Sequence, residues 1–489
     1  MTGPCATLPT VTDVDPSTQA QPQAWPDPSL SADDLVGLTG GRLLARSDRP
    51  IRGAAVDSRV IRPGELFVAL PGERTDGHDH LGEAVTRGAA AVLVTRQPVD
   101  PAALGDVSVV RVPDGLAALA AVATGWRLRF DPLVVGITGS IAKTSTKEAV
   151  AAVVGADRVT LKSEGNQNNE IGLPLTLLRL GPEHRAAVLE MGMYVSGEIA
   201  DLAAMARPQV GVVTAVQAVH LSRIGTIEAI ERAKGELIEA LPADGVAILN
   251  ADDQIVSRMD GRTAARVLRY GFDETADVRA LDVQPAGTAG MRFTLATPRG
   301  RRALTIPTLG RLSVHNAAAA AAVGVAAGIE LDRVVEALEG GWSAPHRVQL
   351  VRLRGVTLID DSYNASPGSM AAALELLADL PGRRVAVLGE MLELGPGHDA
   401  GHEAVGAAAA RVAELLVVVG RDADGIAEGA IAAGLEPGVV HRVADADAAR
   451  DVVAPRLRDG DVVLVKASRG VGLDVLVEAL RSEFGEAAR

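Results

Sequence analysis

The sequence predicts an α/β protein with three domains, each built around a mostly parallel β-sheet. The chain has 489 residues, enough for about three domains of roughly 150 residues each. Short apolar runs alternate with helical stretches along most of its length, a pattern typical of parallel sheets covered by helices. Polar clusters follow several of these runs, at the strand ends where such sheets bind ligands. The same order of elements therefore predicts the fold and the place of a site.

Composition and charge exclude several classes of protein. Hydrophobic residues make up 47% of the chain and aromatic residues only 2%, so Ala, Val and Leu must pack the cores. The net charge of −14 argues against non-specific binding to nucleic acid or to an anionic membrane surface. Cys5 is the only cysteine, which excludes an internal disulfide and a cysteine metal cluster. Without a signal-like segment or a membrane-spanning apolar run, we expect a cytoplasmic protein that does not insert into membranes.

Residues 1–29 are expected to form a disordered tail, and residues 30–128 the first domain. The tail combines Pro, Thr, Gln and Asp without periodicity, so it cannot bury enough apolar surface to fold. In the domain, a turn at Pro63-Gly64 precedes a strand-like run over 65–70.

A polar loop over 72–78 follows that strand, and loops at strand ends commonly carry binding groups. Arg59 and His78 have side chains that could contact a diphosphate. On the residues alone, a solvated surface charge explains either side chain equally well.

The second domain, residues 129–344, opens with the stretch that organises the chain. The apolar run Leu133–Val135 suits a strand buried on both faces, and a small-residue turn then leads to Lys143-Thr144 and a helix. Strand, small-residue turn, Lys-Thr and helix form the layout of a phosphate-binding loop, with backbone N–H groups pointing at the phosphates. Lys143 would reach the β/γ-phosphates, and the Thr144 hydroxyl would hold Mg²⁺.

This loop departs from the pattern G-x-x-x-x-G-K-[ST] at both glycines, which are replaced by Ile137 and Ala142. A buried strand-to-helix turn with an ordinary surface lysine is the alternative interpretation. Glycine is favoured where backbone approaches a ligand, so the Ala142 Cβ either crowds the phosphate or is tolerated because its φ is negative. Because the rest of the site is retained, we expect tolerance.

Strand-like runs recur at 187–191, 210–213 and 246–249, with helical stretches between them. Glu190 lies at the end of the first run, and Asn250, Asp252 and Asp253 follow the third. A carboxylate at such a strand end, beside a nucleotide loop, is a candidate ligand for Mg²⁺.

His220 and Lys234 are less obvious candidates. His220 lies in a loop after a strand, where a histidine is usually a surface side chain. Lys234 lies in the helical run 226–241, which is dense in charge. On the residues alone, a solvated helix face with i,i+3 and i,i+4 ion pairs is the preferred interpretation of Lys234.

The third domain, residues 345–489, has strand-like runs at 356–359, 385–388, 415–419 and 462–465, each followed by a helical stretch. This pattern predicts a second doubly wound, Rossmann-like sheet. Its first strand is followed by Asp361, Ser362, Tyr363 and Asn364, and its last by Lys466, Ala467, Ser468 and Arg469. We expect both polar clusters to face a crevice shared with the second domain.

Eight motifs in order give the chain a resemblance to a known family along nearly its whole length. They read DSRVIRPGELFVAL, GERTDGHD, GNQNNEIGLPLTLL, LEMGM, LNADD, DDSYNASPGSM, VLGEMLELG and VKASRG. The chain resembles the Mur ligases, which join amino acids or dipeptides to a UDP-sugar peptide. The resemblance implies a UDP-binding domain, an ATP-binding domain and a C-terminal Rossmann-like domain.

Within the family, LGEMLELG and DDSYNASP resemble motifs of the member that adds D-alanyl-D-alanine to UDP-N-acetylmuramoyl-tripeptide in peptidoglycan synthesis. The DNPR-like stretch of the member that adds the third peptide residue is absent from the sequence. The resemblance thus implies these two substrates, ATP, two Mg²⁺ ions, a monomer and no nucleic-acid partner.

The resemblance also implies roles for individual residues. It assigns nucleotide binding to Gly139, Ser140, Ile141, Ala142, Lys143, Thr144, Ser145, Asn169, Asn316, Arg347, Asp361 and Tyr363. It assigns the metal ions to Thr144, Glu190, His220 and a carbamylated Lys234, with Lys143, His220 and Lys234 as the catalytic set. It assigns the UDP substrate to Ser58, Arg59, Asp76 and His78, and the peptide to Lys466, Ser468 and Arg469.

The implied reaction is activation of a carboxylate by ATP as an acyl phosphate, followed by attack of an amine. Two alternatives remain open on the sequence. One is another ATP-dependent amide ligase of the same architecture with a different acceptor. The other is a binding module with a degenerate loop, motivated by Ala142. Further departures from the family pattern are Ile141 for Asn, Leu312 for His and Ser313 for Asn.

Overall fold

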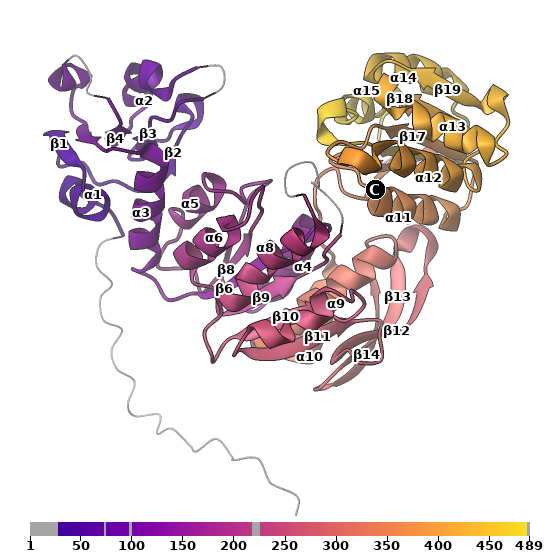
Figure 1. Ribbon diagram of the computed structural model, residues 1–489, viewed down its shortest axis with the longest axis horizontal. Helices are drawn as coiled ribbons and strands as arrows, with labels where there is room; N and C mark the ends of the chain where they lie inside the picture. The colour runs from indigo at the N-terminus through magenta and orange to yellow at the C-terminus, as the bar shows by residue number, and fades with distance from the viewer. Residues whose placement is uncertain (1–27, 73–74, 97–99, 218–224, 487–489) are drawn as a thin grey trace, which may run out of the picture.

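The computed structural model describes residues 28–72, 75–96, 100–217 and 225–486, which form three α/β sheets in sequence order (Figure 1). Residues 1–27 of the predicted tail lie outside the described residues. In the part of the chain that the structure describes, no helix is both long and apolar enough to cross a membrane. Each sheet falls within one of the three predicted domains, whose boundaries stay predictions.

The first sheet has five strands in the order β1-β5-β4-β3-β2, with only β1 antiparallel to its neighbour. The strands are β1 (Arg42–Ala45), β2 (Ala54–Ala55), β3 (Leu66–Val68), β4 (Ala91–Val94) and β5 (Ser108–Arg111). The helices are α1 (Ala32–Thr39), α2 (Leu81–Thr86) and α3 (Gly115–Arg127). Figure 1 shows α3 on the side of the sheet that faces the second domain.

Helix α3 joins the first two domains through a shared core. Val122 and Trp126 on α3 belong to the same buried cluster as Leu177 and Leu202 of the second domain. The indole N–H of Trp126 donates a hydrogen bond to the carbonyl of Leu180 at 3.0 Å. Because buried apolar contact excludes water across this boundary, the first domain is held against the second as one packed unit.

The central sheet has nine strands in the order β14-β13-β12-β11-β10-β9-β6-β8-β7. The parallel strands are β6 (Leu133–Thr138), β7 (Thr160–Lys162), β8 (Ala186–Glu190), β9 (Val210–Val213), β10 (Val246–Asn250), β11 (Arg266–Gly271) and β12 (Val278–Pro285). Strands β13 (Met291–Thr297) and β14 (Gly300–Ile306) continue the sheet as an antiparallel edge. That edge carries the sheet far beyond the nucleotide loop.

Among the described residues, six helices cover the central sheet. They are α4 (Lys143–Gly155), α5 (Gly172–Leu177), α6 (Glu198–Ala206), α8 (Ile227–Glu239), α9 (Arg311–Ala326) and α10 (Leu331–Gly340). Helices α4 and α9 pack together through Val150, Val153 and the alanine run 317–322. Small side chains let the two helix backbones approach closely, so the alanine run that suggested a helix in the sequence is a core element.

The third sheet has the order β15-β16-β20-β17-β18-β19, and only β15 is antiparallel to its neighbour. The strands are β15 (Gln349–Arg352), β16 (Val356–Asp361), β17 (Arg384–Gly389), β18 (Leu415–Val419), β19 (Val440–Val443) and β20 (Asp461–Lys466). The helices are α11 (Pro367–Asp379), α12 (His398–Ala410), α13 (Asp424–Ala432), α14 (Ala446–Val453) and α15 (Asp474–Phe484). Figure 1 places α11 on the side facing the second domain.

The predicted fold class is confirmed, with antiparallel edges added to each sheet. Strands β9 and β18 begin and end where the sequence predicts, and the other predicted strands agree within a few residues. Strands β1, β2, β4, β5, β7, β11, β15 and β19 and the β12–β14 edge were not predicted from the sequence. Most of these strands are short or exposed on one face, so they lack the continuous apolar run of a strand buried on both faces. Strand β4 is an exception, because its four apolar residues are all buried.

Candidate active site between the domains

The phosphate-binding loop lies between β6 and α4 and is tied to the segment that follows β9. The amide of Ser140 donates to the carbonyl of Ala215 at 2.8 Å, and the amide of Gln217 donates to the Ser140 hydroxyl at 3.0 Å. The hydroxyl of Thr214 donates to the carbonyl of Ile141 at 2.6 Å. These bonds shape the loop from outside, so its course does not depend on the two missing glycines.

Ala142 adopts a left-handed conformation with φ of 62°, directly before the first residue of α4. The expectation that its φ would be negative is therefore wrong. A side chain in this region brings Cβ close to the following carbonyl, which costs roughly 1–2 kcal/mol. The loop keeps the backbone shape that glycine would adopt freely, and Ala142 is held in it under strain.

We predict that Ala142→Gly raises the free energy of unfolding by about 1 kcal/mol and tightens apparent ATP binding at most a few-fold. Denaturant unfolding and the KM for ATP measure the two effects. Ala152→Gly is the matched control, because a glycine inside α4 should instead lower stability by about 1 kcal/mol. A native chain without ATP turnover that Ala142→Gly restores would contradict the prediction and favour a degenerate loop.

Lys143, the first residue of α4, and Glu190, the last residue of β8, line the same cavity. The Lys143 ammonium donates to the carbonyl of Gly139 at 2.7 Å, and burial lowers its pKa although Glu190 opposes the shift. Glu190 ends β8, where its Oε1 accepts from the amide group of Asn168 at 2.7 Å. In the described part of the chain its Oε2 is buried without a hydrogen-bond partner.

That orphaned carboxylate oxygen fits a cation, because an anionic oxygen is rarely buried without a compensating charge. Thr144 supplies a hydroxyl on the same cavity wall. Among the described residues, no group of three or more His, Cys, Asp or Glu side chains could hold a metal ion. Within the described residues, a metal here would rely on Glu190 together with groups of other kinds, such as the Thr144 hydroxyl.

Lys234 is buried on the inner face of α8, with 4% of its surface exposed. Burial lowers its pKa well below the ordinary value, and the charge of Lys143 lowers it further. The interpretation of Lys234 as part of a solvated helix face is therefore wrong. The predicted partner His220 lies outside the described residues.

Two cavities meet at Lys143. The first, about 650 Å³, lies between the phosphate loop, the start of α9 and the strand ends of the third domain. The second, about 540 Å³, lies between α3, α6 and the segment before α5. Lys143, Asn168 and Tyr194 line both cavities, whereas Lys234 lines only the second. A ligand in one cavity can thus react with a ligand in the other beside the Lys143 ammonium.

The third domain contributes two arginines to the first cavity. The guanidinium of Arg347 lies 4.2 Å from the ring centre of Tyr363, and that of Arg469 lies 5.3 Å from it. All three side chains line the first cavity. Stacking on an aromatic face orients a guanidinium while leaving its N–H donors available to an anion.

Three predicted site residues, Lys466, Asp361 and Ser468, form hydrogen bonds within the third domain. The Lys466 ammonium donates to Asp361 Oδ2 at 2.6 Å and to the carbonyl of Asn364 at 2.9 Å. The Ser468 hydroxyl oxygen accepts from the amide of Leu392 at 2.9 Å. Lys466 and Ser468 thus fix the loops at the strand ends. Of the three predicted peptide contacts, Arg469 is therefore the best placed to reach a substrate in the cavity.

The two predicted asparagines lie at different cavities. Asn316 on α9 lines the first cavity and accepts a hydrogen bond from Thr146 at 3.1 Å. Asn169 lines the second, where its Oδ1 accepts from the amide of Gly172 at 2.9 Å. Sequence reasoning missed Asn168, which orients Glu190 and lines both cavities. The run of asparagines in GNQNNEIG was the only signal for it.

Asp252 and Asp253 do not take part in this site. Asp252 accepts from the amides of Phe272 and Asp273, and Asp253 from those of Val216 and Ile255. Neither carboxylate lines the two cavities. Of the strand-end carboxylates proposed as magnesium ligands, only Glu190 faces the loop.

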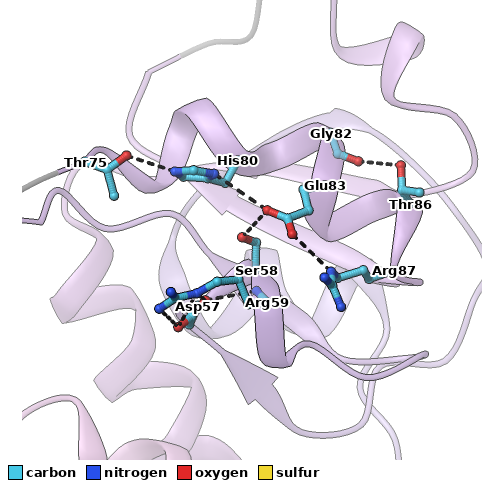
Figure 2. A network of polar contacts seen from close by, with 9 residues as sticks. All are labelled: Asp57, Ser58, Arg59, Thr75, His80, Gly82, Glu83, Thr86 and Arg87. Carbon is cyan, nitrogen blue, oxygen red and sulfur yellow. Dashed lines mark hydrogen bonds and ion pairs between the residues drawn. The ribbon is translucent and has the colours of Figure 1, made fainter.

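Two of the predicted UDP residues of the first domain, Ser58 and Arg59, lie in a polar network (Figure 2). The Ser58 hydroxyl donates to Glu83 at 2.7 Å, and Arg59 pairs with its neighbour Asp57 at 2.7 Å. Glu83 on α2 also pairs with Arg87 and His80, so it links the two ends of this helix to the segment after β2. Arg59 remains highly exposed and is free to turn toward a ligand.

His78 has both ring nitrogens engaged. Its Nδ1 bonds to Asp76 at 2.7 Å, and its Nε2 accepts from the amide of Thr95 at 3.0 Å. This arrangement favours a role for His78 and Asp76 in positioning the loop over 72–78. Direct contact of either with the UDP substrate stays a prediction.

Family models match all three parts of the chain. The model described as "Mur ligase family, catalytic domain" matches residues 50–127, "Mur ligase middle domain" matches 137–324, and "Mur ligase, glutamate ligase domain" matches 346–469. The chain belongs to the Mur ligase family. The resemblance that the motifs indicated is therefore confirmed, and each matched segment lies within one predicted domain.

Curated relatives in the family share the chain's full architecture. The UDP-N-acetylmuramoyl-tripeptide–D-alanyl-D-alanine ligase of Mycobacterium tuberculosis is 41% identical over 465 residues, covering 87% of this chain and 91% of the relative. The ligase of the same name from Escherichia coli is 36% identical over 459 residues, covering 93% and 98%.

Solved structures of Mur ligases superpose on most of the chain. MurF from Acinetobacter baumannii has a TM-score of 0.83 at 28% identity, covering 93% of this chain and 99% of that one. MurF from Thermotoga maritima, in complex with ADP, has a TM-score of 0.78 at 29% identity, covering 88% and 98%. The likeness extends over all three domains of the family fold.

Proposed function

We propose that this chain is the ATP-dependent ligase that joins D-alanyl-D-alanine to UDP-N-acetylmuramoyl-tripeptide in peptidoglycan synthesis. The observation that carries the proposal is the meeting of two cavities at Lys143, a partly buried cation at the end of the phosphate loop. ATP fits the first cavity, with its phosphates on the loop and its adenine toward Asn316. The tripeptide fits the second, reached from the first domain, which would hold the UDP group. We further propose that the enzyme acts in the cytoplasm as a monomer.

The reaction follows from this placement. A carboxylate oxygen of the tripeptide attacks the γ-phosphorus of ATP, the bond to ADP breaks, and an acyl phosphate forms. The amine of D-alanyl-D-alanine then attacks the acyl carbon, inorganic phosphate leaves, and the amine gives up a proton to solvent. The tripeptide carboxylate and the γ-phosphate are both anionic and must come into contact. The main task of Lys143 is therefore to offset their repulsion and fix their positions.

Magnesium would be held by Thr144, Glu190, His220 and Lys234. When bound, it supplies positive charge that neutralises the phosphates and the carboxylate. The unpartnered Oε2 of Glu190 supports this assignment. For Lys234 we propose carbamylation, in which the neutral amine adds dissolved CO₂ and releases a proton. Burial favours the neutral amine that this step needs.

The third domain supplies the acceptor side of the site. Arg347 and Arg469, stacked on Tyr363, present guanidinium donors to the first cavity and would meet the nucleotide phosphates and the dipeptide carboxylate. Closing this domain over the loop would exclude water from the acyl phosphate. Lys466 and Asp361 support that surface as an ion pair rather than as ligands.

We predict that ADP release requires ATP, Mg²⁺, UDP-N-acetylmuramoyl-tripeptide and D-alanyl-D-alanine together. A coupled assay of ADP release, with each component omitted in turn, measures this. L-Alanyl-L-alanine and glutamate serve as control acceptors and should give no turnover above background. If glutamate supports turnover and D-alanyl-D-alanine does not, the acceptor belongs to another branch of the family.

A further inference from the structure

The second cavity carries opposite charge at its two ends. Its inner end is formed by the partly buried Lys143 and the buried Lys234. Its outer rim carries Glu170, just before α5, and Asp201, on the exposed face of α6. A ligand with a carboxylate at one end and a cation at the other would match this arrangement.

Three charged side chains that line this cavity have no polar partner among the residues that the structure describes. In the described part of the chain, the carboxylates of Glu170 and Asp201 and the ammonium of Lys234 form no hydrogen bond or ion pair. Glu198, on the same helix as Asp201, differs because it accepts from the amides of Tyr194 and Val195. The carboxylates of Glu170 and Asp201 are therefore available to a ligand, whereas the Glu198 carboxylate is already hydrogen-bonded to the backbone.

The cavity wall between the two charged ends is apolar, and three of its residues are alanines. Ala117, Ala120 and Ala121 of α3 form one side, and Leu202 and Met205 of α6 contribute to the other. Such a wall suits the methylene stem of a long side chain, because burial of each CH₂ group is favourable. Charged groups occur only where the stem would end.

We propose that Glu170 and Asp201 determine specificity for the third residue of the tripeptide by pairing with an ammonium group on its side chain. This inference rests on the proposed function. With the carboxylate of that residue beside Lys143, its side chain runs along the alanine wall of α3 to the rim. Lysine and 2,6-diaminopimelate both carry the required ammonium group, and a capped or neutral side chain would leave both carboxylates unpaired.

The test compares UDP-N-acetylmuramoyl-tripeptides that end in lysine, 2,6-diaminopimelate or Nε-acetyl-lysine, each with ATP and D-alanyl-D-alanine. The wild-type enzyme should prefer an ammonium-bearing substrate over the acetylated one. Comparison of the lysine and 2,6-diaminopimelate tripeptides shows which of the two supplies the ammonium group. Glu170→Gln with Asp201→Asn should raise the KM for that substrate about tenfold, because exposed ion pairs are individually weak. The kcat and the KM for ATP should stay within about twofold.

Glu274→Gln, an exposed carboxylate outside both cavities, is the matched control and should change none of these values. The preference for the ammonium over the acetylated side chain should fall toward unity only in the double variant. A double variant with wild-type preference, or one whose KM for ATP rises equally, overturns the inference. Absence of turnover with every tripeptide would instead overturn the proposed function, so the two failures are distinguishable.

Discussion

Replacing Lys234 with alanine is expected to lower the kcat for ADP release by about 10³-fold, with little loss of folding stability. The side chain lies buried beside the cavity junction and carries no structural bond among the described residues. Its removal takes away one proposed metal ligand and leaves space where that ligand stood. Steady-state kinetics and thermal unfolding of the purified variant measure the two effects separately.

Chemical rescue separates a ligand from a merely structural lysine. Added formate or acetate should restore part of the activity of Lys234→Ala, because a small carboxylate can take the place of a carbamate. Arg232→Ala, on the exposed face of the same helix, is the control and should keep wild-type kinetics. A Lys234→Ala enzyme with an unchanged rate, or a loss that no carboxylate rescues, would remove this residue from the metal site.

The case of Lys234 shows where sequence reasoning reaches its limit. Helix α8 is dense in charge, and local patterning therefore favoured a solvated face. In the structure Glu236 caps the backbone of α6 through the amides of Gly197 and Ala200, and Glu239 pairs with Arg262. These two carboxylates therefore have partners in other segments of the chain. Only the packing of α8 reveals that the Lys234 side chain turns inward.

The strands that carry the site could be predicted because they are buried on both faces. Such strands appear as short apolar runs, and the polar residue after each run marks the ligand-binding edge. This reasoning placed Glu190 and the phosphate loop correctly. It could not rank the strand-end residues, because Asp252 and Asp253 have the same position in the pattern but accept hydrogen bonds from nearby amides.

The sequence also did not reveal which side chains pair when their residues lie far apart in the chain. Lys466 and Asp361 lie 105 residues apart and form one buried ion pair at the carboxyl ends of two neighbouring strands of the third sheet. Their motifs suggested two separate contacts, one to peptide and one to nucleotide. Parallel pairing of β16 with β20 brings them together, and that register cannot be read from either segment alone.

Gly139→Ala is expected to lower kcat/KM for ATP by about 10²-fold, because a misplaced phosphate loop loses the geometry of the reaction. Gly139 has φ of 150°, a conformation that residues with a side chain rarely adopt. A Cβ at this position would lie 1.9 Å from the Thr214 hydroxyl and 3.0 Å from the amide of Ala215. The hydroxyl would have to move and release the carbonyl of Ile141, which it holds in the loop.

Gly155→Ala is the matched control at the other end of the same helix. A Cβ there meets no atom within 4 Å, and alanine is the better helix former, so activity should be unchanged. Both variants should fold, since the clash at Gly139 is confined to the loop and the end of β9. Isothermal titration with ADP then tests the cause directly: weak binding by Gly139→Ala and normal binding by Gly155→Ala are expected. Equal affinity in the two variants would mean that the loop tolerates a side chain where the structure leaves no room for one.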